Sequence, residues 1–83
     1  MKTVENILKQ ILVEKSSRVE KMELFQKIIW NSGPGDFNNA EEEEVYRALA
    51  YDFDFCYDIN EEPDNEKIVR EVEAVLKELS KIK

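Results

Sequence analysis

The chain has no histidine, a single cysteine, two prolines and two glycines among its 83 residues. Without histidine it lacks the commonest general base of enzymes, the histidine-activated serine and cysteine nucleophiles, and every imidazole metal ligand. The lone Cys56 excludes an intramolecular disulfide and a cysteine-rich zinc site. Gly33-Pro34-Gly35 is not followed by the lysine and hydroxyl residue of a phosphate-binding loop. We therefore expect a protein that is not an enzyme and needs no cofactor.

The scarcity of glycine and proline favours helices over a turn-rich sandwich or barrel. A chain of 83 residues has room for one domain, residues 1–83, with one hydrophobic core. Long apolar runs are also absent. Glu5 and Lys9 interrupt the apolar residues near the N-terminus, which resembles neither a signal peptide nor a membrane span. The expected location is the cytoplasm.

Negative charge is abundant and unevenly distributed. The formal net charge is −7, yet residues 36–66 hold twelve acids against Arg47 alone, which gives that segment a charge of −11. The segments before and after it each carry a small positive excess. Phosphates would be repelled by such a surface, so neither nucleic acid nor an anionic membrane is an expected partner. The charge favours a basic protein as the partner.

The acids that follow Asp52 raise the question of calcium. An EF-hand loop counted from Asp52 has Tyr57 where glycine is required and Pro63 where the bidentate glutamate is required. Counted from Asp58, Pro63 falls on the glycine position and a valine on the glutamate position. Neither register is an EF-hand, and a weak divalent-ion site built from these acids remains an alternative.

Apolar spacing predicts two helices in the first half of the chain. Residues 3–14 carry apolar side chains at steps of three and four, as does a second segment that ends near Asn31, before Ser32-Gly33-Pro34-Gly35. Ser17 and Glu20 match a capping box at the start of the second helix. The apolar positions of the two helices are Val4, Ile7, Leu8, Ile11 and Leu12, then Val19, Met22, Phe25, Ile28 and Ile29.

A third helix is expected to begin at a cap on Asn38 or Asn39 and to continue to about Tyr57. Val45, Leu49, Phe53 and Cys56 follow at helical spacing. Between residues 51 and 57, aromatic residues alternate with others, which is also typical of a half-buried strand. We favour the helix, because a lone strand has no partner here.

The fourth helix is expected to begin at a cap on Asp64 or Asn65, after a break over residues 58–64. Its apolar residues recur at steps of four and three, typical of a bundle seam: Ile68, Val72, Val75, Leu79 and Ile82. Four helices with short connections predict an all-α, antiparallel four-helix bundle.

Each unusual side chain has a structural interpretation as well as a functional one. Cys56 and Trp30 are expected to pack in the core or at a helix end. Glutamates 41–44 are explained by the positive end of a helix dipole. Acids late in the third helix oppose the dipole, so a binding surface explains them better than solubility does. The predicted binding residues are Tyr51, Asp52, Asp54, Phe55, Tyr57, Asp58, Glu61 and Glu62.

The second half of the chain resembles a known family. Residues 43–54 (EEVYRALAYDFD), the acidic loop through Asp64, and residues 69–79 (VREVEAVLKEL) are similar to colicin D immunity proteins and the wider bacterial self-protective, colicin-like immunity group. The resemblance implies a four-helix bundle that inhibits the tRNA-cleaving domain of a cognate toxin. It assigns to Asp52, Asp54 and Asp58 the part of tRNA phosphates. The alternative is a regulatory or adaptor bundle that binds a basic protein unrelated to toxins.

Overall fold

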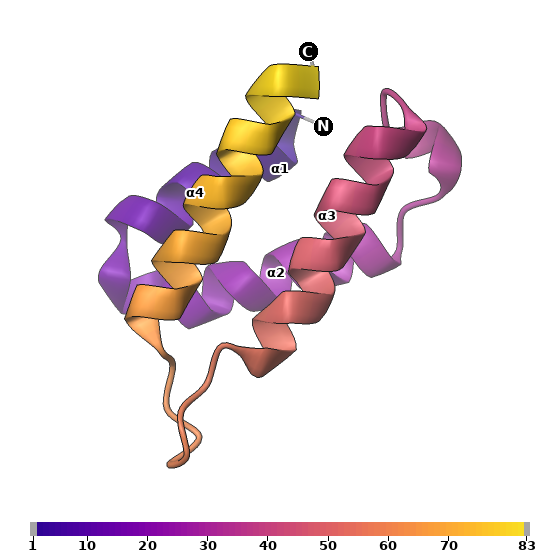
Figure 1. Ribbon diagram of the computed structural model, residues 1–83. Helices are drawn as coiled ribbons and strands as arrows, with labels where there is room; N and C mark the ends of the chain where they lie inside the picture. Colours follow the sequence, from indigo (N-terminus) through magenta and orange to yellow (C-terminus); the bar gives the residue numbers. More distant parts are fainter. Residues whose placement is uncertain (1, 83) are drawn as a thin grey trace.

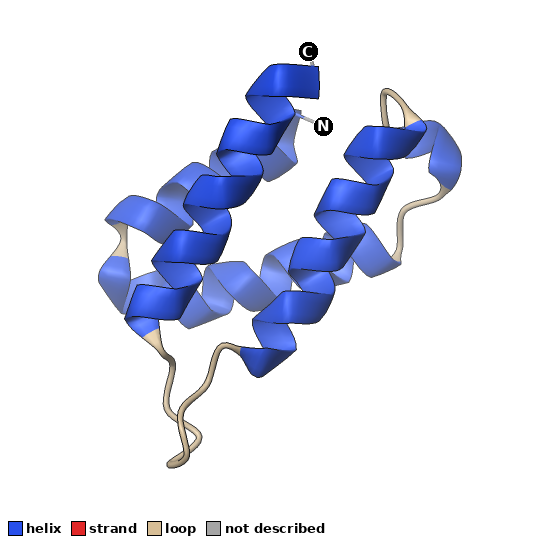
Figure 2. Cartoon of the chain, in the orientation of Figure 1, coloured by secondary structure: helices blue, strands red, loops and turns tan. Residues whose placement is uncertain are grey.

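The computed structural model describes residues 2–82, and within them the protein is an all-α four-helix bundle without a β-strand (Figure 2). This confirms the predicted fold class. Three short 3₁₀ turns lie between the helices. The helices are α1 (Lys2–Val13), α2 (Arg18–Trp30), α3 (Ala40–Asp52) and α4 (Asn65–Ile82), and the 3₁₀ turns are Lys15–Ser17, Pro34–Asp36 and Phe53–Phe55.

The helices pack in a ring in which α1 contacts α2, α2 contacts α3, α3 contacts α4, and α4 returns to α1. In Figure 1, α3 and α4 lie side by side and run in opposite directions, and α2 crosses behind them. The start of α1 and the end of α4 lie together at the top of that view, and the loop between α3 and α4 lies at the bottom. The molecule therefore has one end that carries the chain termini and another that carries the α3–α4 loop.

One apolar stripe from each helix forms the core. In α3 it differs from the predicted stripe, because Tyr46 and Ala50 are fully buried and Val45 is only partly buried. Phe25 lies at the centre of the core, with ring centroids 5.4 Å from Phe53 and 6.1 Å from Tyr46. No helix in residues 2–82 has both the length and the apolar character needed to cross a bilayer. The buried apolar side chains of the four helices are Val4, Ile7, Leu8 and Ile11; Met22, Phe25 and Ile29; Tyr46, Leu49 and Ala50; and Ile68, Val72 and Leu79.

Two predicted helix caps are confirmed. Asn39 Oδ1 accepts a hydrogen bond of 2.8 Å from the backbone amide three residues later, at the start of α3. Asp64 Oδ1 likewise accepts from the amide three residues later, at 3.2 Å, at the start of α4. Each bond satisfies one of the amides that a helix N-terminus leaves without a partner.

The capping box predicted for Ser17 and Glu20 is wrong. Ser17 makes no side-chain capping bond, because it belongs to a 3₁₀ turn that leads straight into α2. The next residue, Arg18, makes the capping bonds at this junction, and it makes them to the end of α1. Arg18 is only 6% exposed. Its guanidinium donates to the carbonyl oxygens of Ile11 at 2.7 Å and Leu12 at 3.2 Å and to Asn65 Oδ1 at 2.8 Å. It thereby caps the end of α1 and connects it to the start of α4.

The predicted extension of the third helix to Tyr57 is also wrong, and so is the strand alternative. The α-helix ends at Asp52 and tightens into the 3₁₀ turn, and Tyr57 then makes one isolated antiparallel bridge with Pro63. A 3₁₀ turn aligns residues three apart on one side, which lets both Phe53 and Cys56 face the core. The aromatic residues between and beside them are left at the surface.

Candidate protein-docking surface

The acidic segment does not form one surface. Glutamates 41–44 lie at the start of α3, whereas the acids from Asp52 onward lie at its end and in the following loop (Figure 1). Along α3, Asp52 follows Glu44 by eight residues and Glu41 by eleven, so the rise of the helix separates the two groups by about 12–17 Å. The acids of residues 36–66 therefore do not cover a partner as one surface. They form two groups at opposite ends of α3.

Arg47, the one base of this segment, compensates the first group and not the second. Its Nε is 2.9 Å from Glu43 Oε2, and its two terminal nitrogens donate to the carbonyl oxygens of Ile29 at 3.2 Å and Ser32 at 3.0 Å. These bonds hold the guanidinium against the end of α2. The nearest base to the second group in sequence is Lys67, whose Nζ donates to the carbonyl oxygen of Phe55 at 3.2 Å.

Apolar side chains gather among the acids of the second group. Tyr51 and Phe55 are 59% and 56% exposed, with ring centroids 5.3 Å apart. Tyr57 is 38% exposed and Ile59 is 97% exposed. Exposed aromatic groups next to uncompensated carboxylates are typical of binding hot spots. We call this region the aromatic–acidic end, and its residues are Tyr51, Asp52, Asp54, Phe55, Tyr57, Asp58, Ile59, Glu61 and Glu62.

Two of its predicted acids are held by other groups. Asp54 Oδ1 accepts from Nε2 of Gln26 on α2 at 2.9 Å, and the same Nε2 donates to the carbonyl oxygen of Ala50 at 2.8 Å. Asp58 Oδ1 accepts from the backbone amides two and four residues later, at 2.9 and 3.0 Å. Asp58 therefore organises its own loop, in addition to any contact with a partner.

The other three predicted acids, Asp52, Glu61 and Glu62, are not held by such bonds in the described residues. Within residues 2–82, no side-chain hydrogen bond or ion pair involves the carboxylates of Asp52, Glu61 or Glu62. Glu61 and Glu62 are exposed, and Asp52 is half-buried. The structure thus brings all eight predicted binding residues to one end of the molecule. Asp54 and Asp58 are engaged in hydrogen bonds within the protein, whereas the carboxylates of the other acids are not.

A further acid comes from α2. The pKa of Tyr57 is raised, first by its partial burial and then by the negative charges of Glu23 and Asp54. Glu23 therefore lies close enough to add its charge to the aromatic–acidic end. The sequence did not indicate Glu23 as part of this surface, because it lies 34 positions before Tyr57 and no local pattern connects the two residues. Ile59 was missed as well, although an aliphatic residue in a polar break is a visible signal.

Cys56 packs in the core, as predicted. It has no exposed surface, and its Sγ donates to the carbonyl oxygen of Asp52 at 3.3 Å. Burial is the main cause of its raised pKa, and the nearby charge of Lys67 opposes the shift. A buried neutral thiol is a poor nucleophile.

Of the two structural positions expected for Trp30, the core or a helix end, the structure has the second. Trp30 is the last residue of α2, and its side chain is 51% exposed.

The acids do not converge on a metal position. In the described part of the chain, no group of three or more cysteine, aspartate or glutamate side chains is arranged to hold a metal ion. Asp54 and Asp58 instead face Gln26 and the loop amides.

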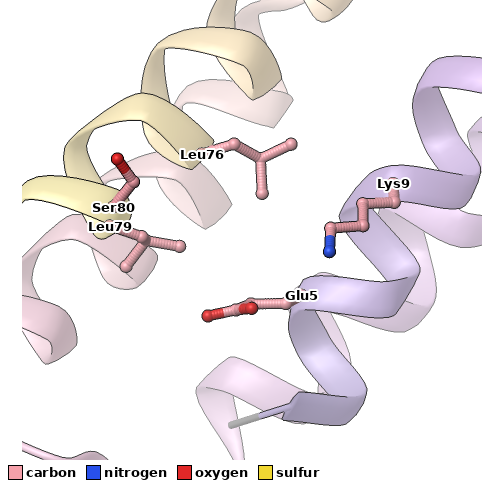
Figure 3. A pocket seen from close by; sticks show the side chains of 5 residues that line it. All are labelled: Glu5, Lys9, Leu76, Leu79 and Ser80. Carbon is pink, nitrogen blue, oxygen red and sulfur yellow. The ribbon is translucent and has the colours of Figure 1, made fainter. Parts of the chain in front are cut away.

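A small open pocket lies elsewhere, between α1 and α4. Its volume is about 240 Å³. Glu5 and Lys9 of α1 face Leu76, Leu79 and Ser80 of α4 across it (Figure 3). Its lining residues belong to α1 (Lys2–Val13) and to the second half of α4 (Asn65–Ile82), and none belongs to the aromatic–acidic end. Three of its five lining residues, Glu5, Lys9 and Ser80, are polar.

No family model, curated protein or solved structure matches this chain. What the aromatic–acidic end offers follows from its own geometry: exposed rings, an exposed aliphatic side chain, and several carboxylates, with the Lys67 ammonium on the Phe55 carbonyl. Such a surface is suited to a protein partner with complementary positive charge.

Proposed function

We propose that this protein is an immunity-type inhibitor that binds a basic bacterial toxin domain through its aromatic–acidic end. The toxin class implied by the resemblance is a colicin D-like, tRNA-cleaving ribonuclease. One observation carries the proposal: the exposed Tyr51–Phe55 pair lies among carboxylates that form no ion pair with an arginine in residues 2–82. Neither a solvated surface nor helix-dipole chemistry explains that combination.

The mechanism is occupation of a substrate groove. A ribonuclease binds RNA phosphates with lysine and arginine side chains. Carboxylates such as Asp52 and Glu62 would pair with those cations and take the place of the phosphates. The aromatic rings would cover the contact and exclude water, which strengthens each charged pair.

The charge distribution also favours rapid binding. The net charge is −7, and the aromatic–acidic end carries five acids, Asp52, Asp54, Asp58, Glu61 and Glu62. Complementary charge steers association to as much as about 10⁸–10⁹ M⁻¹s⁻¹ at low salt. An inhibitor that protects a cell from a toxin needs such speed as well as affinity.

Growth of cells tests the proposal. The C-terminal domain encoded by the reading frame directly upstream is expressed alone, together with this protein, or together with an unrelated acidic helical protein as control. We expect the domain to arrest growth and only this protein to restore it. Arrest that this protein fails to relieve, or no arrest at all, would reject the immunity function and favour an adaptor role.

A further inference from the structure

The segment between α3 and α4 is an ordered hairpin. The amide of Asp58 donates to the carbonyl oxygen of Glu62 at 2.8 Å, and the amide of Glu61 donates to that of Asp58 at 2.9 Å. Glu61 has a φ of 63°, in the left-handed region. A turn followed by a left-handed residue is the usual form of a three-residue hairpin loop. The loop residues are Ile59, Asn60 and Glu61.

Bonds at both ends hold this hairpin on the bundle. The amide of Asp64 donates to the carbonyl oxygen of the buried Cys56 at 2.9 Å, and Tyr57 bridges to Pro63. Asp64 also caps α4. At the tip, the Asp58 carboxylate accepts the two loop amides described above. The hairpin therefore projects in one conformation from the end of the molecule opposite the termini (Figure 1).

Its tip presents an apolar side chain. Ile59 is 97% exposed, the highest value among the large apolar residues. A flexible loop would be free to fold this side chain onto the bundle, whereas the hairpin bonds keep it in water. Burial of an isoleucine side chain in an apolar site is favourable, so its fixed exposure leaves that gain available for binding a partner.

The charge around Ile59 restricts what covers it. Asp58, Glu61 and Glu62 surround it in the hairpin, all exposed and acidic. A second copy of the chain would bring the same acids against them, and an anionic lipid surface would be repelled in the same way. The complementary partner is a protein with an apolar pocket rimmed by lysine or arginine.

We propose that the hairpin of residues 57–63 is a rigid finger that inserts Ile59 into an apolar, basic-rimmed pocket on the partner protein. This inference rests on the proposed function and specifies how the same end of the molecule binds. Ile59 anchors the contact, and the flanking acids pair with the rim.

Substitution of Ile59 tests the finger. The probe is the purified C-terminal domain encoded directly upstream, and the measurement is binding kinetics to the full-length chain. We expect Ile59→Ser to weaken binding about 10- to 100-fold, mainly through faster dissociation. The control is Val13→Ser at the end of α1, a site that is also exposed, at 80%, and this variant should bind like the wild type.

The outcomes separate the two proposals. Wild-type affinity in Ile59→Ser would overturn the finger and leave the immunity function standing. Equal weakening in both serine variants would also overturn it, because loss of any exposed apolar group would then suffice. No binding of the wild-type chain to the upstream domain would overturn the proposed function and the finger together.

Discussion

Tyr46 illustrates a polar group enclosed by apolar packing. Its side chain is fully buried, with ring centroids 6.1 Å from Phe25 and 6.0 Å from Phe37. Among the described residues, none forms a hydrogen bond with its hydroxyl. The pKa of Tyr46 is raised above its ordinary value of 10 by burial and then by the charges of Glu5 and Glu42. A buried hydroxyl without a partner costs about 1–3 kcal/mol.

Removal of that hydroxyl should therefore stabilise the fold. We expect Tyr46→Phe to raise the free energy of unfolding by about 1 kcal/mol at neutral pH. Above pH 10 the unfolded chain releases this phenolic proton while the folded protein keeps it. The wild type then loses up to about 1.4 kcal/mol per pH unit from this group, and the variant does not. Urea unfolding followed by Trp30 fluorescence measures both effects. A destabilised variant, or parallel losses above pH 10, would contradict them.

Among the structural elements, three helix ends are capped by side chains that also connect neighbouring helices. Arg18 caps the end of α1, Arg47 caps the end of α2, and Gln26 caps the end of α3 through the carbonyl oxygen of Ala50. Each side chain comes from a different element than the end it caps, so these bonds also join neighbouring helices. Two of the three donors are arginines, Arg18 and Arg47. Because their guanidinium groups donate to backbone carbonyls, these two cations do not pair with the acids of the aromatic–acidic end.

The α3–α4 hairpin depends on Asp58 in a way that substitutions can separate from its charge. Asp58→Asn keeps an oxygen acceptor for the two loop amides, whereas Asp58→Ala removes it. We expect residues 59–61 to remain rigid in the asparagine variant and to become mobile in the alanine variant. Backbone ¹⁵N relaxation measures this as a fall of the order parameter from about 0.85 to below about 0.6. Equal order in both variants would show that the backbone bonds alone hold the hairpin.

At the scale of the whole molecule, the separation of the two acidic groups predicts unequal effects on binding rate. About 12–17 Å of helix lies between them, which exceeds the Debye length of about 8 Å at physiological salt. Charges at the start of α3 therefore contribute little to the potential at the aromatic–acidic end. Net charge alone does not determine which end meets the partner.

Paired variants measure this difference. Asp52→Asn with Asp54→Asn should slow association with the domain encoded upstream about threefold to tenfold and flatten its salt dependence. The double change preserves an oxygen that can accept from Gln26. Glu41→Gln with Glu44→Gln removes the same charge from the other end and should change the rate less. Stopped-flow kinetics at low and physiological ionic strength measure the association rate of each variant. Equal slowing by both would argue against a localised docking surface.

Local patterns were enough to predict the helices, most of the buried faces and two of the caps. Apolar residues at steps of three and four have one arrangement that buries them, and the side chains of Asn39 and Asp64 reach amides only three residues away. The candidate acids and aromatic residues were also visible, because they follow one another along a short segment. These features depend on neighbours in the chain.

Only the tertiary structure decided the rest. The end of α3 depends on which of two aromatic residues the core admits, and Phe53 enters it while Phe55 remains outside. The long-range contacts of Arg18 with Asn65, and the approach of Glu23 to Tyr57, join residues more than thirty positions apart. The sequence by itself therefore determined a helical bundle with an acidic, aromatic segment. Packing decided that this segment divides into two groups and that one of them presents Ile59 on a rigid hairpin, because close packing selects among side chains that local spacing treats alike.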